Sequence, residues 1–232
     1  MTSTGSGRGC DAPAASPTAL ADIGPIEQLR AGRLAVRLPL LLVGLLLYGA
    51  SLAMMVRGAL GLAPWDVLHV GLTHWVPFTL GQTLIGVSFL ILLLWIPLRE
   101  RPGLGTIANS VLVGVAADLT LGVVDEPASW AARIPLTVGG VALNAVATGL
   151  YIGSQFGRGP RDGLMTGLVR RTGHSVRVVR TSIEVTVVAV GWLLGGPVGA
   201  GTVLYALAIG PLVQLALPWC TVRLPERRTG TA

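Results

Sequence analysis

Six long apolar runs, separated by short polar segments, dominate the hydrophobic pattern of this 232-residue chain. The runs cover residues 38–56, 79–98, 104–124, 134–154, 179–196 and 200–219. Each is close to the roughly 20 residues that an α-helix needs to cross a bilayer. The pattern therefore predicts an all-α membrane protein with six transmembrane helices.

Polar and glycine positions between these runs recur at an offset of 96 residues. Two motifs occur once in each half. Gly-x-x-Pro-x-Asp lies at Gly61, Pro64 and Asp66 and again at Gly157, Pro160 and Asp162. Gly-x-Gly-Thr ends in Gly105 and Thr106 and again in Gly201 and Thr202. Without a gap, residues 34–122 share 19 identities with residues 130–218 over 89 aligned positions. Because glycine and proline dictate backbone geometry, matches of these types are informative. We predict two versions of one three-span unit.

The repeat gives the domain organisation. Residues 34–124 form the first three-span repeat and residues 130–219 the second. Residues 1–33 are rich in Gly, Ser, Ala, Pro and Thr, which predicts a disordered N-terminal tail. Residues 220–232 form a C-terminal tail, and we expect both tails to be cytoplasmic.

Arginine placement supports that orientation. With a cytoplasmic N-terminus, fourteen arginines flank cytoplasmic span ends, namely Arg30, Arg33, Arg37, Arg99, Arg101, Arg158, Arg161, Arg170, Arg171, Arg177, Arg180, Arg223, Arg227 and Arg228. Only Arg57 and Arg133 flank outer ends, so the distribution follows the positive-inside rule. Since each unit has an odd number of spans, the second enters the membrane from the opposite side. This inverted topology is found in secondary transporters, whose sites lie at the repeat interface, and also in channels.

Each Pro-x-Asp element opens a short segment, Trp65 to Trp75 in the first unit and Arg161 to Arg171 in the second. Eleven helical residues rise only about 16 Å, too little to cross roughly 30 Å of hydrocarbon. These segments are therefore half-helices, either re-entrant or interfacial. Pro64 and Pro160 suit the first helical position.

The two aspartates of these elements allow two readings. Asp66 and Asp162 fall at the third helical position, where a carboxylate accepts from free amides and offsets the positive helix end. In the other reading, both half-helix starts line a cavity in which these carboxylates bind solute or a proton. Arg161, which replaces Trp65 of the first unit, then forms an ion pair with Asp162 or contacts an anion.

A charged cluster occurs in the second unit only. Glu184 lies about one turn inside the fifth run, where ionisable groups are costly and usually face the protein interior. Arg180 and Glu184 are spaced i, i+4 and form a helical ion pair. The pair either sits at the membrane interface or acts as a cytoplasmic gate that closes onto Asp162. The Gly-x-Gly-Thr elements start the third and sixth spans, with Thr106 and Thr202 as expected N-caps.

Composition excludes several functional classes. Only 12% of residues are charged and 52% are hydrophobic, whereas soluble domains carry roughly 25% charged residues. The 17 arginines flank apolar runs and form no single nucleic-acid-binding patch. Two cysteines build no disulfide framework, and no metal-ligand or catalytic spacing occurs. We expect no cofactor, no metal and no enzymatic activity.

The paired Pro-x-Asp elements, the run Arg161-Asp162-Gly163-Leu164-Met165, and Arg180 with Glu184 resemble the YczE branch of the YczE/YyaS/YitT family of bacterial integral membrane proteins. The similarity covers residues 38–219. It implies a multi-pass protein of the bacterial inner membrane and says little about activity.

These observations favour a small-solute permease or transporter. Its site lies between the two repeats, with Asp66, Arg161 and Asp162 binding the solute or a proton and Arg180 with Glu184 forming the gate. The alternative is a non-transporting scaffold or accessory protein that docks a partner on its basic cytoplasmic face.

Overall fold

The computed structural model describes residues 28, 32–222 and 224. Most of the two predicted tails lies outside these residues. The eight described helices of more than one residue are α2 (Leu34–Gly58), α3 (Pro64–Thr73), α4 (Leu80–Leu98), α5 (Leu104–Leu121), α6 (Trp130–Gly153), α7 (Pro160–Thr172), α8 (Val176–Leu193) and α9 (Ala200–Cys220). The same residues contain no strand, so the all-α prediction is confirmed for this part of the chain.

Five helices are long and apolar enough to cross a membrane: α2, α4, α5, α6 and α9. The helix α8 has 18 residues but is not among them. It carries three charged residues, Arg177, Arg180 and Glu184. Length and composition alone therefore support five of the six predicted spans.

Helix starts follow the sequence repeat. The helices α2, α3, α4 and α5 begin at residues 34, 64, 80 and 104, and α6, α7, α8 and α9 begin at 130, 160, 176 and 200. Each start in the first set lies 96 residues before its counterpart. Both short helices, α3 with 10 residues and α7 with 13, begin at the proline of the Pro-x-Asp element, as its position predicted.

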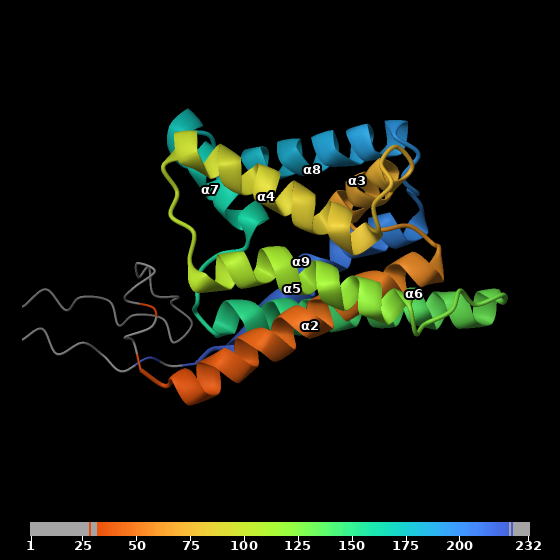
Figure 1. Cartoon of the computed structure of the whole chain (residues 1–232), viewed down its shortest axis with the longest axis horizontal. Coiled ribbons are helices and arrows are strands. Elements are labelled where there is room, and N and C mark those ends of the chain that lie inside the picture. The colour runs from red at the N-terminus through yellow and green to blue at the C-terminus, as the bar shows by residue number, and fades with distance from the viewer. Residues whose placement is uncertain (1–27, 29–31, 223, 225–232) are drawn as a thin grey trace, which may run out of the picture.

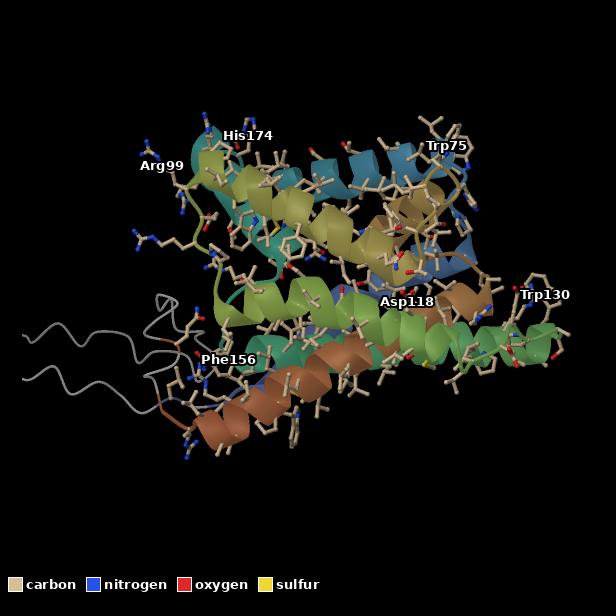
Figure 2. The ribbon with its side chains drawn as sticks, viewed as in Figure 1. Trp75, Arg99, Asp118, Trp130, Phe156 and His174 are labelled. Carbon is tan, nitrogen blue, oxygen red and sulfur yellow. The ribbon has the colours of Figure 1, made fainter. Side chains whose placement is uncertain are left out.

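The bundle is organised around a central pair of helices, α2 and α6. The helix α5 packs on α2 and α9 packs on α6, while α3 packs on α8 and α7 on α4. Figure 1 shows the short helices α3 and α7 at opposite ends of the bundle. Trp75 and Trp130 lie at one of these ends, and Arg99 and His174 lie at the other (Figure 2). Trp side chains are favoured at membrane interfaces.

Close helix approach depends on glycine. A Cβ at Gly191 of α8 would lie 2.5 Å from the backbone nitrogen of Leu68 in α3, and a Cβ at Gly49 of α2 would collide with the carbonyl of Val113 in α5. In a bilayer, where burial of apolar surface does not drive helices together, such contacts let the backbones pack directly.

The motif glycines have a conformational role. Gly61 and Gly157, which precede the two short helices, have φ values of +113° and +109°. Residues with a Cβ rarely adopt this region, so glycine is required at both turns. These two glycines therefore allow the chain to turn from a long helix into a short one.

The N-cap expectation for Thr106 and Thr202 is wrong. The N-caps are Gly103 and Gly199, and both threonines lie at the third helical position. Each hydroxyl accepts a hydrogen bond from the N-cap amide, at 3.1 Å in α5 and 3.3 Å in α9. Each helix starts three residues earlier than expected because Gly103 and Gly199 adopt the extended N-cap conformation, and the threonine side chain reaches back to the N-cap amide.

The two helix starts also exchange hydrogen bonds with the opposite half. The amide of Gly105 donates to the carbonyl of Phe156 at 2.8 Å, and the amide of Gly201 donates to the carbonyl of Leu60 at 2.7 Å. Gly105 and Gly201 correspond in the repeat, as do Leu60 and Phe156. The two contacts are therefore reciprocal, with each half holding the turn that precedes the other half's short helix.

Candidate functional site

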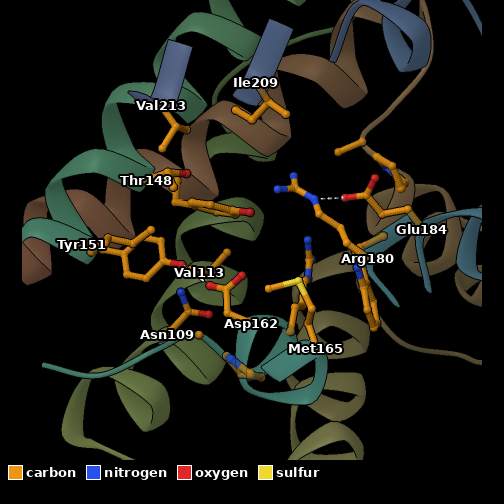
Figure 3. A pocket seen from close by; sticks show the side chains of 18 of the residues that line it. Asn109, Val113, Thr148, Tyr151, Asp162, Met165, Arg180, Glu184, Ile209 and Val213 are labelled. Carbon is orange, nitrogen blue, oxygen red and sulfur yellow. Dashed lines mark hydrogen bonds and ion pairs between the residues drawn. The ribbon is translucent and has the colours of Figure 1, made fainter. Parts of the chain in front are cut away.

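A cavity of about 320 Å³ lies between the helices and receives side chains from all eight (Figure 3). Its wall includes Pro64 and Trp65 at the start of α3, Pro160 to Asp162 at the start of α7, and Arg180 with Glu184 from α8. Of the five predicted solute-binding and gate residues, four line it: Arg161, Asp162, Arg180 and Glu184. The predicted half-helix starts are thus brought together, although they are 96 residues apart.

The starts of the two short helices meet directly. The guanidinium carbon of Arg161 lies 5.2 Å from the centroid of the Trp65 ring, which is within the range of a cation–π contact. Because α3 and α7 extend from this point toward opposite ends of the bundle (Figure 1), their N-termini are internal. The positive ends of both helix dipoles consequently face the cavity.

Asp66 lies behind the cavity wall. It is 4% exposed, and its Oδ1 is 3.4 Å from Nη2 of Arg161 and 3.3 Å from Nδ1 of His69. Arg161 therefore pairs with Asp66 and not with its neighbour Asp162, contrary to one of the sequence expectations. Adjacent residues on a helix do not face each other, and the carboxylate that Arg161 reaches comes from the other half of the chain.

Asp162 faces the cavity and accepts a hydrogen bond from the hydroxyl of Tyr151 at 2.8 Å (Figure 3). Neither Asp66 nor Asp162 accepts a hydrogen bond from a backbone amide of its own helix start. The capping role is therefore absent, since both carboxylates are turned toward side chains on other segments or on the next turn.

Arg180 and Glu184 form the expected i, i+4 ion pair, with 2.9 Å between Nε and Oε1. Their side chains are 53% and 35% exposed within the protein. Neither forms an ion pair with Asp162, which remains bonded to Tyr151. The gate contact considered from the sequence is not formed in this conformation.

Three tyrosines of the cavity wall were missed as site residues: Tyr48, Tyr151 and Tyr205. The rings of Tyr48 and Tyr151 meet edge to face at 6.2 Å, and Tyr205 donates to Asn144 at 3.1 Å. A signal existed in the repeat alignment, because Tyr48 aligns with Asn144 and Tyr205 with Asn109. Polar residues at matching mid-helix positions of the two halves indicate that these positions face the same interior.

The predicted structural residues separate into two groups. Pro64 and Pro160 line the cavity. The other six shape the turns and helix starts around it and are absent from its wall: Gly61, Gly105, Thr106, Gly157, Gly201 and Thr202.

Comparison with known proteins identifies relatives along almost the whole described chain. A family model described as "Family of unknown function (DUF6198)" matches residues 35–218. An "Uncharacterized protein" of Haemophilus influenzae is 37% identical over 187 residues, covering 81% of this chain and 85% of the relative. The "Uncharacterized membrane protein YczE" of Bacillus subtilis is 32% identical over 187 residues, covering 80% and 87%.

A third relative is more distant. The "Uncharacterized protein YyaS" of Bacillus subtilis is 24% identical over 180 residues, covering 76% of this chain and 90% of the relative. No solved structure gives a significant match. The motifs that resemble YczE lie within the matched region, and the apolar helices agree with a membrane protein. By this match over residues 35–218, the chain belongs to the family of unknown function DUF6198 and is a relative of the membrane proteins YczE and YyaS.

Proposed function

We propose that this protein is a small-solute permease or transporter of the bacterial cytoplasmic membrane, with its site in the central cavity. One observation carries the proposal: a single cavity collects four charged side chains and the N-termini of both short helices. Ionisable groups inside a membrane protein are costly and usually mark a pathway for a solute or ion. A protein that served only as a scaffold has no need to assemble them in its interior.

The residues have distinct roles in this proposal. Arg161 holds an anionic group of the solute, and Asp66 positions Arg161 from behind the wall. Asp162 binds a cationic group or a coupling proton, because only Tyr151 occupies its carboxylate. Arg180 and Glu184 are the gate, since their ion pair lines the cavity and is partly exposed. No step of the proposed function requires a cofactor or a chemical reaction.

The proposal includes two inverted repeats of three spans each, with α8 as the sixth crossing. The matched helix starts, the reciprocal Gly105–Phe156 and Gly201–Leu60 hydrogen bonds and the opposite positions of α3 and α7 support it. An odd number of crossings per repeat explains why the short helices point inward from opposite ends. With the arginine bias, both termini are cytoplasmic.

Topology is tested with single cysteines in a chain whose native cysteines are replaced by serine. Phe78 follows α3 and His174 follows α7, and both are exposed. A membrane-impermeant thiol reagent added to intact cells should label Phe78→Cys only, and His174→Cys should react only after permeabilisation. Labelling of both positions from the same side would refute the inverted repeat.

The cavity itself is tested at Met165, which lines it. We expect Met165→Cys to react with a hydrophilic thiol reagent, because a transport site must be reached by water. Leu207→Cys is the matched control, since Leu207 is 72% exposed on α9 and faces lipid in this arrangement. A screen of charged solutes for protection of Cys at 165 then identifies ligands.

Asp162→Asn completes this experiment. An asparagine oxygen can still accept from Tyr151, so the unfolding temperature should change little. Protection by the solute should be lost, because the charge is lost. An unreactive cysteine at 165, or protection that survives in Asp162→Asn, would contradict the proposed site and leave the scaffold as the better reading.

A further inference from the structure

The two halves differ at one helix pair. In the first half α4 packs along α5, whereas their counterparts α8 and α9 make almost no direct contact. The helix α9 is correspondingly open: only Gly201, Thr202 and Ile209 of its 21 residues are buried. The bundle is therefore closed on the α4–α5 side of the cavity and parted on the α8–α9 side.

Two substitutions between the repeats accompany the difference, at the positions of Gly81 and Asp118, while the glycine at Gly114 is kept as Gly210. In the first half, Gly81 and Gly114 lie against each other's carbonyls, and the amide of Gly81 donates to Asp118 at 2.8 Å. The corresponding residues of the second half are Arg177, Gly210 and Gln214. Arg177 is exposed, and a Cβ at Gly210 would meet nothing within 4 Å, so these positions do not reproduce the close glycine contact of the first half.

The cavity reaches the surface through this gap. Leu84 lines the closed side and is 4% exposed, whereas its counterpart Arg180 lines the parted side with 53% of its side chain exposed. Gln214 of α9 also lines the cavity and is exposed. Figure 3 shows Arg180 and Glu184 on the side of the pocket that faces Ile209 and Val213 of α9.

Depth in the membrane follows from helix geometry. At about 1.5 Å per residue, Arg180 and Glu184 lie roughly 6 and 12 Å from the start of α8. Because an 18-residue helix of about 27 Å is slightly shorter than the roughly 30 Å hydrocarbon core, Arg180 lies just inside that core, where its long side chain can reach the headgroups, and Glu184 lies deeper. The exposed surface of α9 outside the cavity wall is apolar, with Val203, Leu207 and Leu215 all exposed. A charged entrance just below the headgroups, beside an apolar helix surface, matches an amphiphile and not a freely soluble molecule.

We propose that the ligand of this cavity is a membrane amphiphile whose headgroup carries both a phosphate and an amine, and that it enters sideways between α8 and α9. The proposal rests on the proposed function and specifies its substrate class and route. Two cations, Arg161 and Arg180, and two carboxylates, Asp162 and Glu184, line the cavity. This balance complements a zwitterion: the phosphate contacts the arginines and the ammonium contacts the carboxylates, while the acyl chains lie along α9.

The test uses the full chain reconstituted in vesicles with a phosphatidylethanolamine that carries a photoreactive group near the headgroup end of one acyl chain. We expect cross-links at the lining residues of the gap, Ile183, Ile209 and Val213. Unlabelled phosphatidylethanolamine should compete more strongly than phosphatidylglycerol, which lacks the amine. Free phosphoethanolamine, which lacks the acyl chains, should compete weakly.

A matched pair of variants tests whether cross-linking depends on the gap between α8 and α9. Gly210→Trp places an indole at a residue that lines the cavity, and Gly86→Trp places the same side chain on α4 at a residue outside the cavity wall; a Cβ at either position meets nothing within 4 Å. Cross-linking in the gap should be lost in Gly210→Trp and retained in Gly86→Trp. Both variants should keep the unfolding temperature, because a Cβ at either position meets nothing within 4 Å.

Other outcomes overturn the inference. Cross-links that spread over all lipid-facing helices and ignore Gly210→Trp mean ordinary lipid contact. Covalent dimers joined through α8 and α9 mean that a second copy of the chain covers the gap. A soluble solute could protect Met165→Cys, keep doing so in Gly210→Trp, and leave no lipid cross-links. This result would support the permease and contradict the amphiphile as its ligand. Lipid cross-links in the gap together with an unreactive cysteine at 165 would support a lipid-binding site and contradict the permease.

Discussion

Replacing Arg37 by methionine should lower the free energy of unfolding by about 3–5 kcal/mol, the cost of leaving a buried polar network without its charged partner. The side chain is fully buried. Its Nε donates to the carbonyl of Ser154 at 2.8 Å, Nη1 to Gln28 at 2.7 Å and Nη2 to Gln155 at 2.8 Å. Methionine keeps the apolar stem but supplies no donor.

The physical reason is that four carbonyls, including that of Gly32 at 3.4 Å, accept hydrogen bonds from one guanidinium. Buried carbonyls that lose a donor cost roughly 1–3 kcal/mol each. Arg37 also lies 4.3 Å from the centroid of Phe156, so it fixes the turn between α6 and α7 against α2. Because Phe156 holds the start of α5 through Gly105, the loss should propagate to the base of the cavity.

Arg133 is the matched control, since it occupies the same position in the second unit. Its side chain is 26% exposed and bonds to Glu126 at 2.8 Å and to the carbonyl of Pro127 at 2.8 Å. Arg133→Met should cost about 1 kcal/mol or less, as expected for an exposed pair. Unfolding of both variants in detergent micelles measures the difference, and equal costs would show that the buried network is not a major stabilising element.

The second large effect concerns the pair formed by Asp66 and Arg161. Arg161→Met would leave the Asp66 carboxylate, which is 4% exposed, with His69 as its remaining partner. We expect a cost of about 3–5 kcal/mol from this uncompensated charge. Asp66→Asn should be costly for the complementary reason, because Arg161 then faces the cavity without its carboxylate.

A double-mutant cycle separates the pair from its surroundings. Asp66→Asn combined with Arg161→Met should cost less than the sum of the single changes, with a coupling of about 1–3 kcal/mol. The same cycle on Arg180 and Glu184, whose side chains are 53% and 35% exposed, should give a coupling of about 0.5 kcal/mol. Additive costs at Asp66 and Arg161 would show that the 3.4 Å contact is energetically unimportant.

The cycle also distinguishes the roles of the two aspartates. Asp66→Asn should weaken solute protection of Met165→Cys together with the unfolding temperature, because it acts by positioning Arg161. Asp162→Asn should weaken protection alone. If Asp66→Asn left stability unchanged and removed protection, Asp66 would be a ligand-binding residue, as the sequence first suggested, and its place behind the wall would be misleading.

The local backbone structure could be predicted from the sequence. Proline at Pro64 and Pro160, each preceded by a glycine with positive φ, marks where a short helix begins, because proline fixes φ and glycine alone tolerates the turn. The length and apolar character of the runs gave the long helices, since a bilayer admits few backbone structures. The 96-residue offset also matches each helix start in the first half to one in the second.

The contacts between side chains could not be predicted from the sequence. Arg161 and Asp162 are adjacent in sequence, yet Arg161 reaches Asp66, 95 positions away. The N-cap of α5 and α9 was misplaced for a related reason, because the choice between Thr106 and Gly103 depends on the turn that packs against the helix start. Tyr151 gave no signal of its own, and only its contact with Asp162 places it in the site.

The sequence by itself determined that this is a helical membrane protein built from two related units with paired short helices, because backbone preference and partition into lipid are set by nearby residues. Only the tertiary structure decided that the short helices meet, that Asp66 supports Arg161, and that α8 stands away from α9. These depend on how closely particular helices approach. Gly81 permits a close crossing only because Gly114 lies opposite it, and the sequence alone does not show which residue lies opposite.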